Sequence, residues 1–122
     1  MPLAYAIDPE RRVVTITGDY SEPDEWRRLL TAVGADPAYS RGHGFLRDLR
    51  GSSSPVSIMS VIGILAVVRE FWTGLGVTRA AILTRPGIDA LANVAHALAE
   101  DERLPVRAFD SYDDAVAWLE GD

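Results

Sequence analysis

The sequence predicts an α/β domain with a mixed sheet of about five strands and four flanking helices, in the order ββαβαβαβα. Short β-prone runs alternate with amphipathic helical patterns, which is typical of parallel strands joined by right-handed helical crossovers. The first two runs are separated by only four residues, a length that permits only antiparallel pairing. Because the chain has 122 residues and 48% apolar content, we expect residues 1–122 to form a single domain.

The N-terminal part of the chain predicts a hairpin followed by a helix. Residues 4–7 and 12–17 are β-prone runs, and the Asp-Pro-Glu-Arg segment at 8–11 is typical of a turn. Ser21 stands three residues before Asp24, as in a capping box, so we expect the helix to begin there and to end near the glycine at position 34. Its apolar positions, at helical spacing, are Trp26, Leu29, Leu30 and Val33.

The remainder of the chain alternates between strand and helix. The predicted strands are residues 44–49, 79–84 and 105–109. The predicted helices are residues 57–73, a helix with apolar positions Ile88, Leu91, Ala92, Ala95 and Leu98, and a last helix with apolar positions Tyr112, Ala115, Val116 and Leu119. Ser111 and Asp114 have the spacing of a helix cap at the start of the last helix.

The charge and the residue types exclude several classes of function. Twelve basic against eighteen acidic residues give a net charge of −6, which disfavours binding to nucleic acid or to an anionic membrane surface. All the basic residues are arginine, so no lysine can supply an amine nucleophile or a Schiff base. The absence of cysteine excludes disulfides and thiolate metal sites. We therefore expect no cofactor.

The sequence also predicts the compartment. The N-terminus lacks a charged region followed by an apolar one, as a signal peptide would have, and the lack of cysteine fits a reducing compartment. The longest apolar stretch, residues 56–68, is shorter than the roughly 20 residues that span a bilayer. We expect a cytoplasmic protein with no membrane insertion.

The order of elements resembles that of the SpoIIAA-like branch of the STAS/Sec14-type domains. In STAS anti-sigma-factor antagonists, a phosphorylatable serine follows the central strand in an Asp-Ser-Ser-Gly-Leu-like motif. This chain has Gly-Ser-Ser-Ser-Pro at 51–55 in that place, without the Ser-Gly-Leu register, so the resemblance implies a phosphorylation site between Ser52 and Ser57 only if the altered motif is tolerated. The residues that carry the resemblance are Asp48, Leu49, Arg50, Phe109, Asp110, Ala115, Trp118 and Leu119.

The common catalytic motifs are absent. The sequence has no Gly-x-Ser-x-Gly elbow, no phosphate-binding loop and no His-Glu-x-x-His pair. His43 and Asp48 could form a triad with a serine at 52–54, but the predicted strand separates the histidine from the serines, which favours a plain loop histidine. His96 shares a helical stripe with acidic residues, a spacing that permits a metal site but that favours a solvated polar face. We expect neither a catalytic nor a metal site.

The loops after three strands suggest a ligand or partner surface, because ligands of open α/β sheets bind beyond the carboxyl ends of the strands. Each loop precedes a helix N-terminus, and two carry an arginine that could hold an anion. Alternatively, these two arginines pair with neighbouring carboxylates such as Asp48, Asp89 or Asp110. The predicted surface comprises Asp48, Arg50, Ser52, Ser53, Ser54, Ser57 and Arg85.

The second predicted helix is apolar nearly all round and must be covered on nearly all sides. One sheet face covers only part of it, so the remainder should meet a neighbouring helix, a second copy of the chain or an apolar ligand. We expect a homodimer or an apolar ligand at a face comprising Ser60, Gly63, Val67, Phe71 and Trp72.

Two functions follow as hypotheses. The first is a non-enzymatic binding or regulatory module that recognises a protein partner through the 52–57 segment and the adjoining helix face. The second is a Sec14-like protein that binds a small molecule or lipid in an apolar cavity against residues 56–68. The sequence leaves the identity of the protein partner, or of the small apolar or anionic ligand, open.

Overall fold

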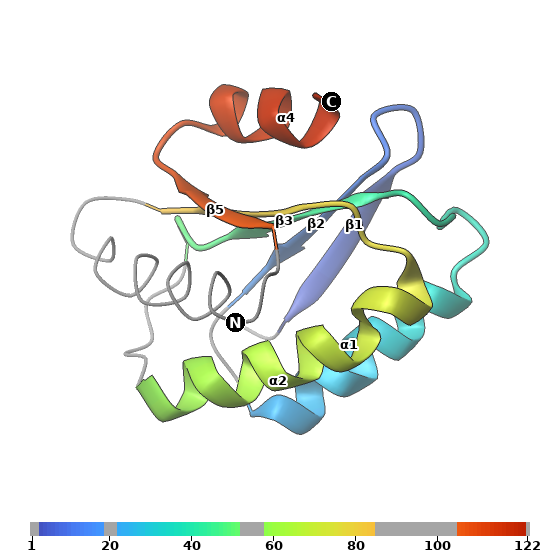
Figure 1. The fold of residues 1–122 in the computed structure, drawn as a ribbon, viewed down its shortest axis with the longest axis vertical. Coiled ribbons are helices and arrows are strands. Elements are labelled where there is room, and N and C mark those ends of the chain that lie inside the picture. Colours follow the sequence, from blue (N-terminus) through green and yellow to red (C-terminus); the bar gives the residue numbers. More distant parts are fainter. Residues whose placement is uncertain (1–2, 19–21, 52–57, 85–104, 122) are drawn as a thin grey trace.

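A computed structural model describes residues 3–18, 22–51, 58–84 and 105–121 of the chain. Five strands form one mixed sheet whose spatial order equals the chain order (Figure 1). The first pair is antiparallel and the remaining pairs are parallel, as the sequence predicted. The strands are β1 (Ala4–Asp8), β2 (Val13–Thr17), β3 (Gly44–Asp48), β4 (Ala80–Leu83) and β5 (Val106–Phe109).

Helices cover both faces of the sheet. The helices α1 (Pro23–Ala35) and α2 (Ile58–Leu75) lie side by side on one face, and α4 (Tyr112–Glu120) lies on the other (Figure 1). Side chains of β3 alternate between the two layers: Phe45 packs with α1 and α2, and Leu46 packs with α4. The predicted helix around residues 88–98 lies outside the described residues.

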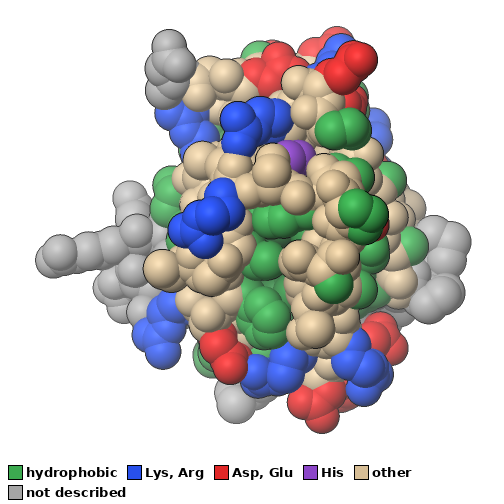
Figure 2. Space-filling view, turned by 90° about the vertical axis from the view of Figure 1, so that its right-hand side faces the viewer, with side chains coloured by type: hydrophobic (Ala, Val, Ile, Leu, Met, Phe, Trp, Pro, Cys, Tyr) green, Lys and Arg blue, Asp and Glu red, His purple; other side chains and the backbone are tan. Residues whose placement is uncertain are grey.

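An edge view of the molecule shows the consequence of this layering. In Figure 2, charged side chains gather at the upper end, where α4 lies, and at the lower end, where α1 and α2 lie. Hydrophobic side chains are seen between them, at the level where the sheet packs on α1 and α2. This layer between the sheet and the two helices contains the larger of the two apolar cores.

The predicted turn between β1 and β2 is confirmed. The carboxylate of Asp8 accepts hydrogen bonds from the backbone N–H groups of Glu10 and Arg11, each at 3.1 Å. Arg12 then adopts a φ of 59°, in the left-handed region that non-glycine residues rarely occupy. Its guanidinium donates to the carbonyl oxygen of Arg41, which ties the hairpin to the segment before β3.

The predicted start of α1 is wrong, and that of α4 is right. Glu22, not Ser21, is the N-cap residue of α1, and it makes no side-chain capping hydrogen bond. Pro23 explains the shift, because proline favours the first helical position and forces the preceding residue into the extended conformation, here φ −68° and ψ 152°. At α4, the side chain of Ser111 accepts a hydrogen bond of 3.3 Å from the backbone N–H of Asp114.

Helix α2 runs two residues further than predicted, to Leu75, where Gly76 with a φ of 67° follows its last turn. Its contact with α1 requires a glycine: a Cβ atom added at Gly63 would lie 2.9 Å from Cγ of Pro23. Val67 is only 2% exposed and belongs to the core. Both residues therefore have packing roles within the chain, and the homodimer contact expected at this face stays a prediction. In the described part of the chain, no helix has the length and apolar character needed to cross a membrane.

We expect Gly63→Ala to destabilise the fold, although alanine is the better helix former. The new methyl group would push α1 away from α2, and such overpacking costs about 1–3 kcal/mol. Gly74→Ala in the same helix is the matched control, because a Cβ atom there meets nothing within 4 Å. The control should be neutral or stabilised by up to about 1 kcal/mol. Urea unfolding measures both, and equal stabilisation of the two variants would contradict the proposed contact.

Candidate ligand cavity

A cavity of about 100 Å³ lies between α2 and the sheet. Its described lining comes from strands β2 to β5, from α1 and α2, and from Val77. These described residues are hydrophobic except for Arg47. The lining residues are Ile16, Trp26, Leu30, Phe45, Arg47, Ile64, Leu65, Val68, Phe71, Trp72, Leu75, Val77, Ala80, Ala81, Ile82 and Val106.

The cavity follows from the sizes of the side chains in one row of the sheet. Phe45, Ala80 and Val106 occupy paired positions on β3, β4 and β5, so their side chains point to the same face. The alanine between two larger side chains fills little of the space below α2. Phe71 and Trp72 of α2, both only partly buried, line the same space. The alanine and the aromatic residues therefore border a gap between α2 and the sheet.

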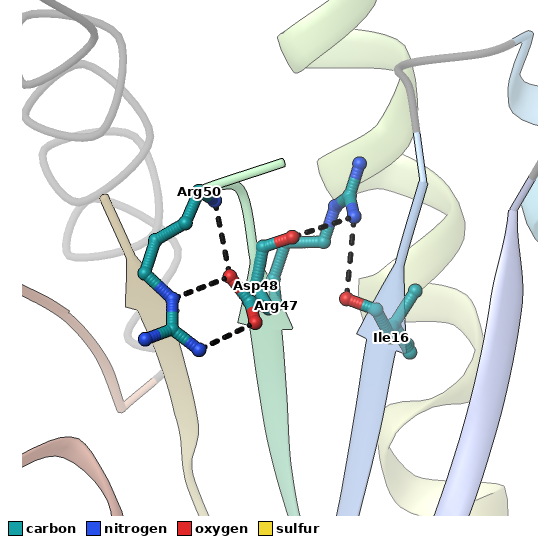
Figure 3. A network of polar contacts seen from close by, with 4 residues as sticks. All are labelled: Ile16, Arg47, Asp48 and Arg50. Carbon is teal, nitrogen blue, oxygen red and sulfur yellow. Dashed lines mark hydrogen bonds and ion pairs between the residues drawn. The ribbon is translucent and has the colours of Figure 1, made fainter. Parts of the chain in front are cut away.

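Arg47 and Trp26 are the two lining residues that contact each other through a guanidinium and an aromatic ring. The guanidinium of Arg47 lies 5.3 Å from the centroid of the Trp26 ring. Its Nη1 donates to the carbonyl oxygens of Ile16 at 3.2 Å and Asp48 at 3.4 Å (Figure 3). Its Nη2 donates to the carbonyl oxygen of Gly18 at 2.9 Å. These bonds fix the cation near the carboxyl ends of β2 and β3 and offset part of its desolvation.

Trp26 is nearly fully buried, with 4% of its surface exposed. Its indole Nε1 has no hydrogen-bond acceptor among the described residues. A buried donor left without a partner costs about 1–3 kcal/mol. Most buried donors in folded proteins have a partner, so this one calls for an explanation.

Asp48 and Arg50, both predicted site residues, bind each other at the carboxyl end of β3. Oδ1 of Asp48 accepts from the backbone N–H of Arg50 at 3.0 Å and from its Nε at 3.1 Å, and Oδ2 accepts from its Nη2 at 2.9 Å (Figure 3). The guanidinium also lies 5.6 Å from the ring centroid of Tyr112 in α4. Of the two alternatives that the sequence left open for this arginine, the structure contains the pairing with a carboxylate.

The ion pair changes the acidity of Asp48. Partial burial by itself raises the pKa of this carboxyl group, but hydrogen bonds from the side chain and backbone of Arg50, with the charges of Arg50 and Arg47, lower it more. The net result is a pKa below the ordinary value of 3.8. The carboxylate is therefore held in its charged, hydrogen-bonded form and acts as a structural partner of Arg50.

The described members of the two predicted surfaces lie on opposite faces of the sheet. Asp48 and Leu46 share the α4 side of β3, whereas Phe71 and Trp72 line the cavity on the α2 side. The other members of the predicted surface after the strands lie outside the described residues; they are Ser52, Ser53, Ser54, Ser57 and Arg85. The side chain of Ser60, from the other predicted face, is not described.

Sequence reasoning missed Trp26 and Arg47 as site residues. Trp26 was predicted to be core, and Arg47 received no role. One signal was available for Arg47: it stands two residues after Phe45, so the alternation of a strand puts a charged side chain on the same face as an apolar one.

His43 lies in the loop before β3, as the sequence predicted, and it is buried there. It is 1% exposed, its Nδ1 lies 2.7 Å from the carbonyl oxygen of Ser40, and its ring lies 4.9 Å from that of Tyr39. It precedes β3, whereas Asp48 is the last residue of that strand, so the structure does not bring these two members of the proposed triad together. No group of three or more histidine, aspartate or glutamate side chains suited to a metal ion occurs within the described residues.

The fold is that of a mixed α/β domain with SpoIIAA-like architecture. The solved structure of a protein from Shewanella loihica PV-4 matches it with a TM-score of 0.63 and 14% sequence identity, covering 97% of this chain and 94% of that one. That protein is described as an uncharacterized member of the DUF3478 family with a SpoIIAA-like fold. No protein-family model and no curated protein matches the sequence. At this identity the likeness shows the fold alone, which confirms the fold that the resemblance implied.

We expect the Asp48–Arg50 pair to make stability depend on pH. Because the folded-state pKa of Asp48 is lowered, its contribution is present above the unfolded pKa and is lost as the pH falls through the folded value. Asp48→Asn should therefore lower the free energy of unfolding by about 0.5–1 kcal/mol at pH 7. The effect is limited because Arg50 is partly exposed to solvent. Near pH 2 the substitution should not change the free energy of unfolding.

Urea unfolding at the two pH values measures this difference. Glu10→Gln, a change of the same kind at an exposed hairpin residue, serves as the control and should leave stability nearly unchanged at both. A cost of Asp48→Asn that is the same at pH 7 and pH 2 would show that the charge of the carboxylate is not what stabilises the fold.

Proposed function

We propose that this chain is a non-enzymatic binding module whose cavity between α2 and the sheet takes a small apolar ligand. The cavity itself carries the proposal: about 100 Å³ of space with a nearly apolar lining. An engineered apolar cavity of roughly 150 Å³ in another protein stays dry and binds benzene or xenon. Each Å² of apolar ligand surface removed from water contributes about 25 cal/mol to binding.

The lining residues support binding over catalysis. Among the described residues that line the cavity there is no serine, histidine, aspartate or glutamate. The nucleophiles and general bases that these residue types supply are therefore missing from the described wall. The fold likeness to a SpoIIAA-like protein supports a module of STAS type, and the assignment of a ligand to the cavity is our own.

The cavity has more support than the protein-partner surface. Most residues of that surface lie outside the described part of the chain, and Arg50 is already bonded to Asp48. The cavity, in contrast, is lined by described residues of four strands and two helices. Recognition of a protein partner through the 52–57 segment stays a prediction.

Benzene is a suitable first ligand because it fills a small apolar space and has no polar group. We expect a titration followed by ¹H–¹⁵N NMR spectra to show saturable shifts of residues at the cavity, such as Phe45 and Ala80, and not of Ala115 or Val116 on the α4 side. Native mass spectrometry of freshly purified protein would detect a ligand carried through purification. Benzene shifts that do not saturate, or that spread equally over both faces, would refute the proposal.

Filling the cavity should abolish binding. We expect Ala80→Leu to weaken benzene binding at least tenfold, because the longer side chain occupies the ligand's space, and Ala80→Val to have a smaller effect. Ala117→Leu, the same change at an exposed position on α4, should bind as the wild type does. Circular dichroism confirms that each variant is folded. Unchanged affinity in folded Ala80→Leu protein would place the ligand elsewhere.

A further inference from the structure

A polar hollow at the amino ends of β2, β3 and β4 carries three arginines. Its volume is about 640 Å³, within the range of roughly 300–1,000 Å³ that is typical of small-molecule sites. It adjoins the last residues of α4 and shares no described lining residue with the cavity below α2. The described residues that line the hollow are Glu10, Arg11, Arg12, Gly42, Thr78, Arg79, Leu119, Glu120 and Gly121.

Backbone hydrogen bonds place Arg12 and Arg79 on either side of β3. The carbonyl oxygen of Arg12 accepts from the N–H of Gly44 at 2.8 Å, and that of Arg79 accepts from the N–H of Phe45 at 2.9 Å. Because neighbouring strands lie about 4.8 Å apart, the Cα atoms of the two arginines are separated by roughly 10 Å. Both side chains line the same hollow, so both guanidiniums can reach one small anion between them.

Local contacts hold the two guanidiniums and leave most of their N–H groups for a ligand. A Cβ atom added at Gly42 would lie 2.6 Å from Nη2 of Arg12, so the absence of a side chain there makes room for this guanidinium. Arg12 donates to the carbonyl oxygen of Arg41, and Arg79 donates to that of Trp118. Each guanidinium thus uses one of its five N–H groups within the described part of the chain. Arg12 is exposed and Arg79 is partly exposed, so solvent and ligands have access to both.

The hollow has an excess of positive charge. Arg11 forms an ion pair with Glu120 at 3.7 Å, whereas neither Arg12 nor Arg79 forms an ion pair with a carboxylate among the described residues. The remaining acidic residue of the described lining is Glu10, so two guanidiniums stand against one carboxylate. Arginine binds phosphate oxygens through paired, charge-assisted hydrogen bonds.

We propose that this hollow binds a phosphate group, free or esterified to a small molecule, between the guanidiniums of Arg12 and Arg79. A phosphate monoester has a charge of about −1.5 to −2 at pH 7, which matches two guanidiniums better than a single carboxylate does. The volume of the hollow leaves room for the body of a small phosphate ester. This inference goes beyond the proposed function and does not depend on the apolar ligand.

Calorimetric titrations of the full chain with glycerol 3-phosphate, inorganic phosphate, acetate and glycerol test the proposal. We expect both phosphate compounds to bind, acetate to bind more weakly than either, and glycerol not to bind. Tighter binding of glycerol 3-phosphate than of inorganic phosphate would assign the site to phosphorylated small molecules, and equal or weaker binding would assign it to free phosphate. In ¹H–¹⁵N NMR spectra the amide resonances of Gly42 and Thr78 should shift, and that of Leu30 on the α2 side should not.

Variants of the charged lining residues separate anion binding from a structural role. Arg12→Gln and Arg79→Gln should each weaken phosphate binding about tenfold, because each removes charge-assisted hydrogen bonds. Arg28→Gln, the same change at an exposed position on α1, should bind as the wild type does. Glu10→Gln removes a negative charge from the hollow and should tighten phosphate binding, which a purely structural role of the arginines would not explain. Circular dichroism confirms that each variant is folded.

The outcomes that would overturn this inference do not involve the apolar cavity. They are the absence of phosphate binding to the wild type, unchanged binding in folded Arg12→Gln and Arg79→Gln proteins, and acetate binding as tight as that of phosphate. If Arg79→Gln protein does not fold, Arg12→Gln and Glu10→Gln still decide the question. Failure of benzene to bind would contradict the proposed function and leave the phosphate site standing.

Discussion

The alternation of side chains along β3 determines where the Arg47 guanidinium and the Asp48–Arg50 ion pair lie. This strand is covered on both faces, with Phe45 7% and Leu46 0% exposed, so each residue must match the layer that it enters. Period-two alternation sends Arg47 toward α1 and α2 and Asp48 toward α4. A register shift of one residue would exchange the two layers, which parallel pairing with β2 and β4 prevents.

Placing Arg47 against an apolar core costs free energy because its cation loses water. The carbonyl oxygens at the ends of β2 and β3 accept its hydrogen bonds and offset part of the cost. The guanidinium lies 5.3 Å from the centroid of the Trp26 ring, which is typical of a cation–π contact. Arg47, Trp26 and Ala80 all line the cavity on the α2 side of the sheet.

Much of the fold could be predicted from local patterns, whereas the cavity could not. The strands, the Asp8 turn and the Ser111 cap depend on short-range spacing, which the sequence displays directly. The start of α1 was mispredicted because a capping-box pattern was preferred over the proline at the first helical position. The cavity depends on whether Ala80 and its neighbours on three strands fill the space below α2, which is a property of packing in three dimensions. A tryptophan at an apolar helix position likewise predicts burial without revealing that its N–H lacks a partner.

The most direct test of a ligand cavity below α2 is a crystal structure of the chain under xenon pressure, since xenon reports apolar space without requiring a polar partner. We expect one strong xenon peak between Phe45, Ala80 and Trp72, with the side chains around it unmoved. A space filled by a side chain, or a peak found only on the α4 side of the sheet, would contradict the assignment of this cavity as a ligand site.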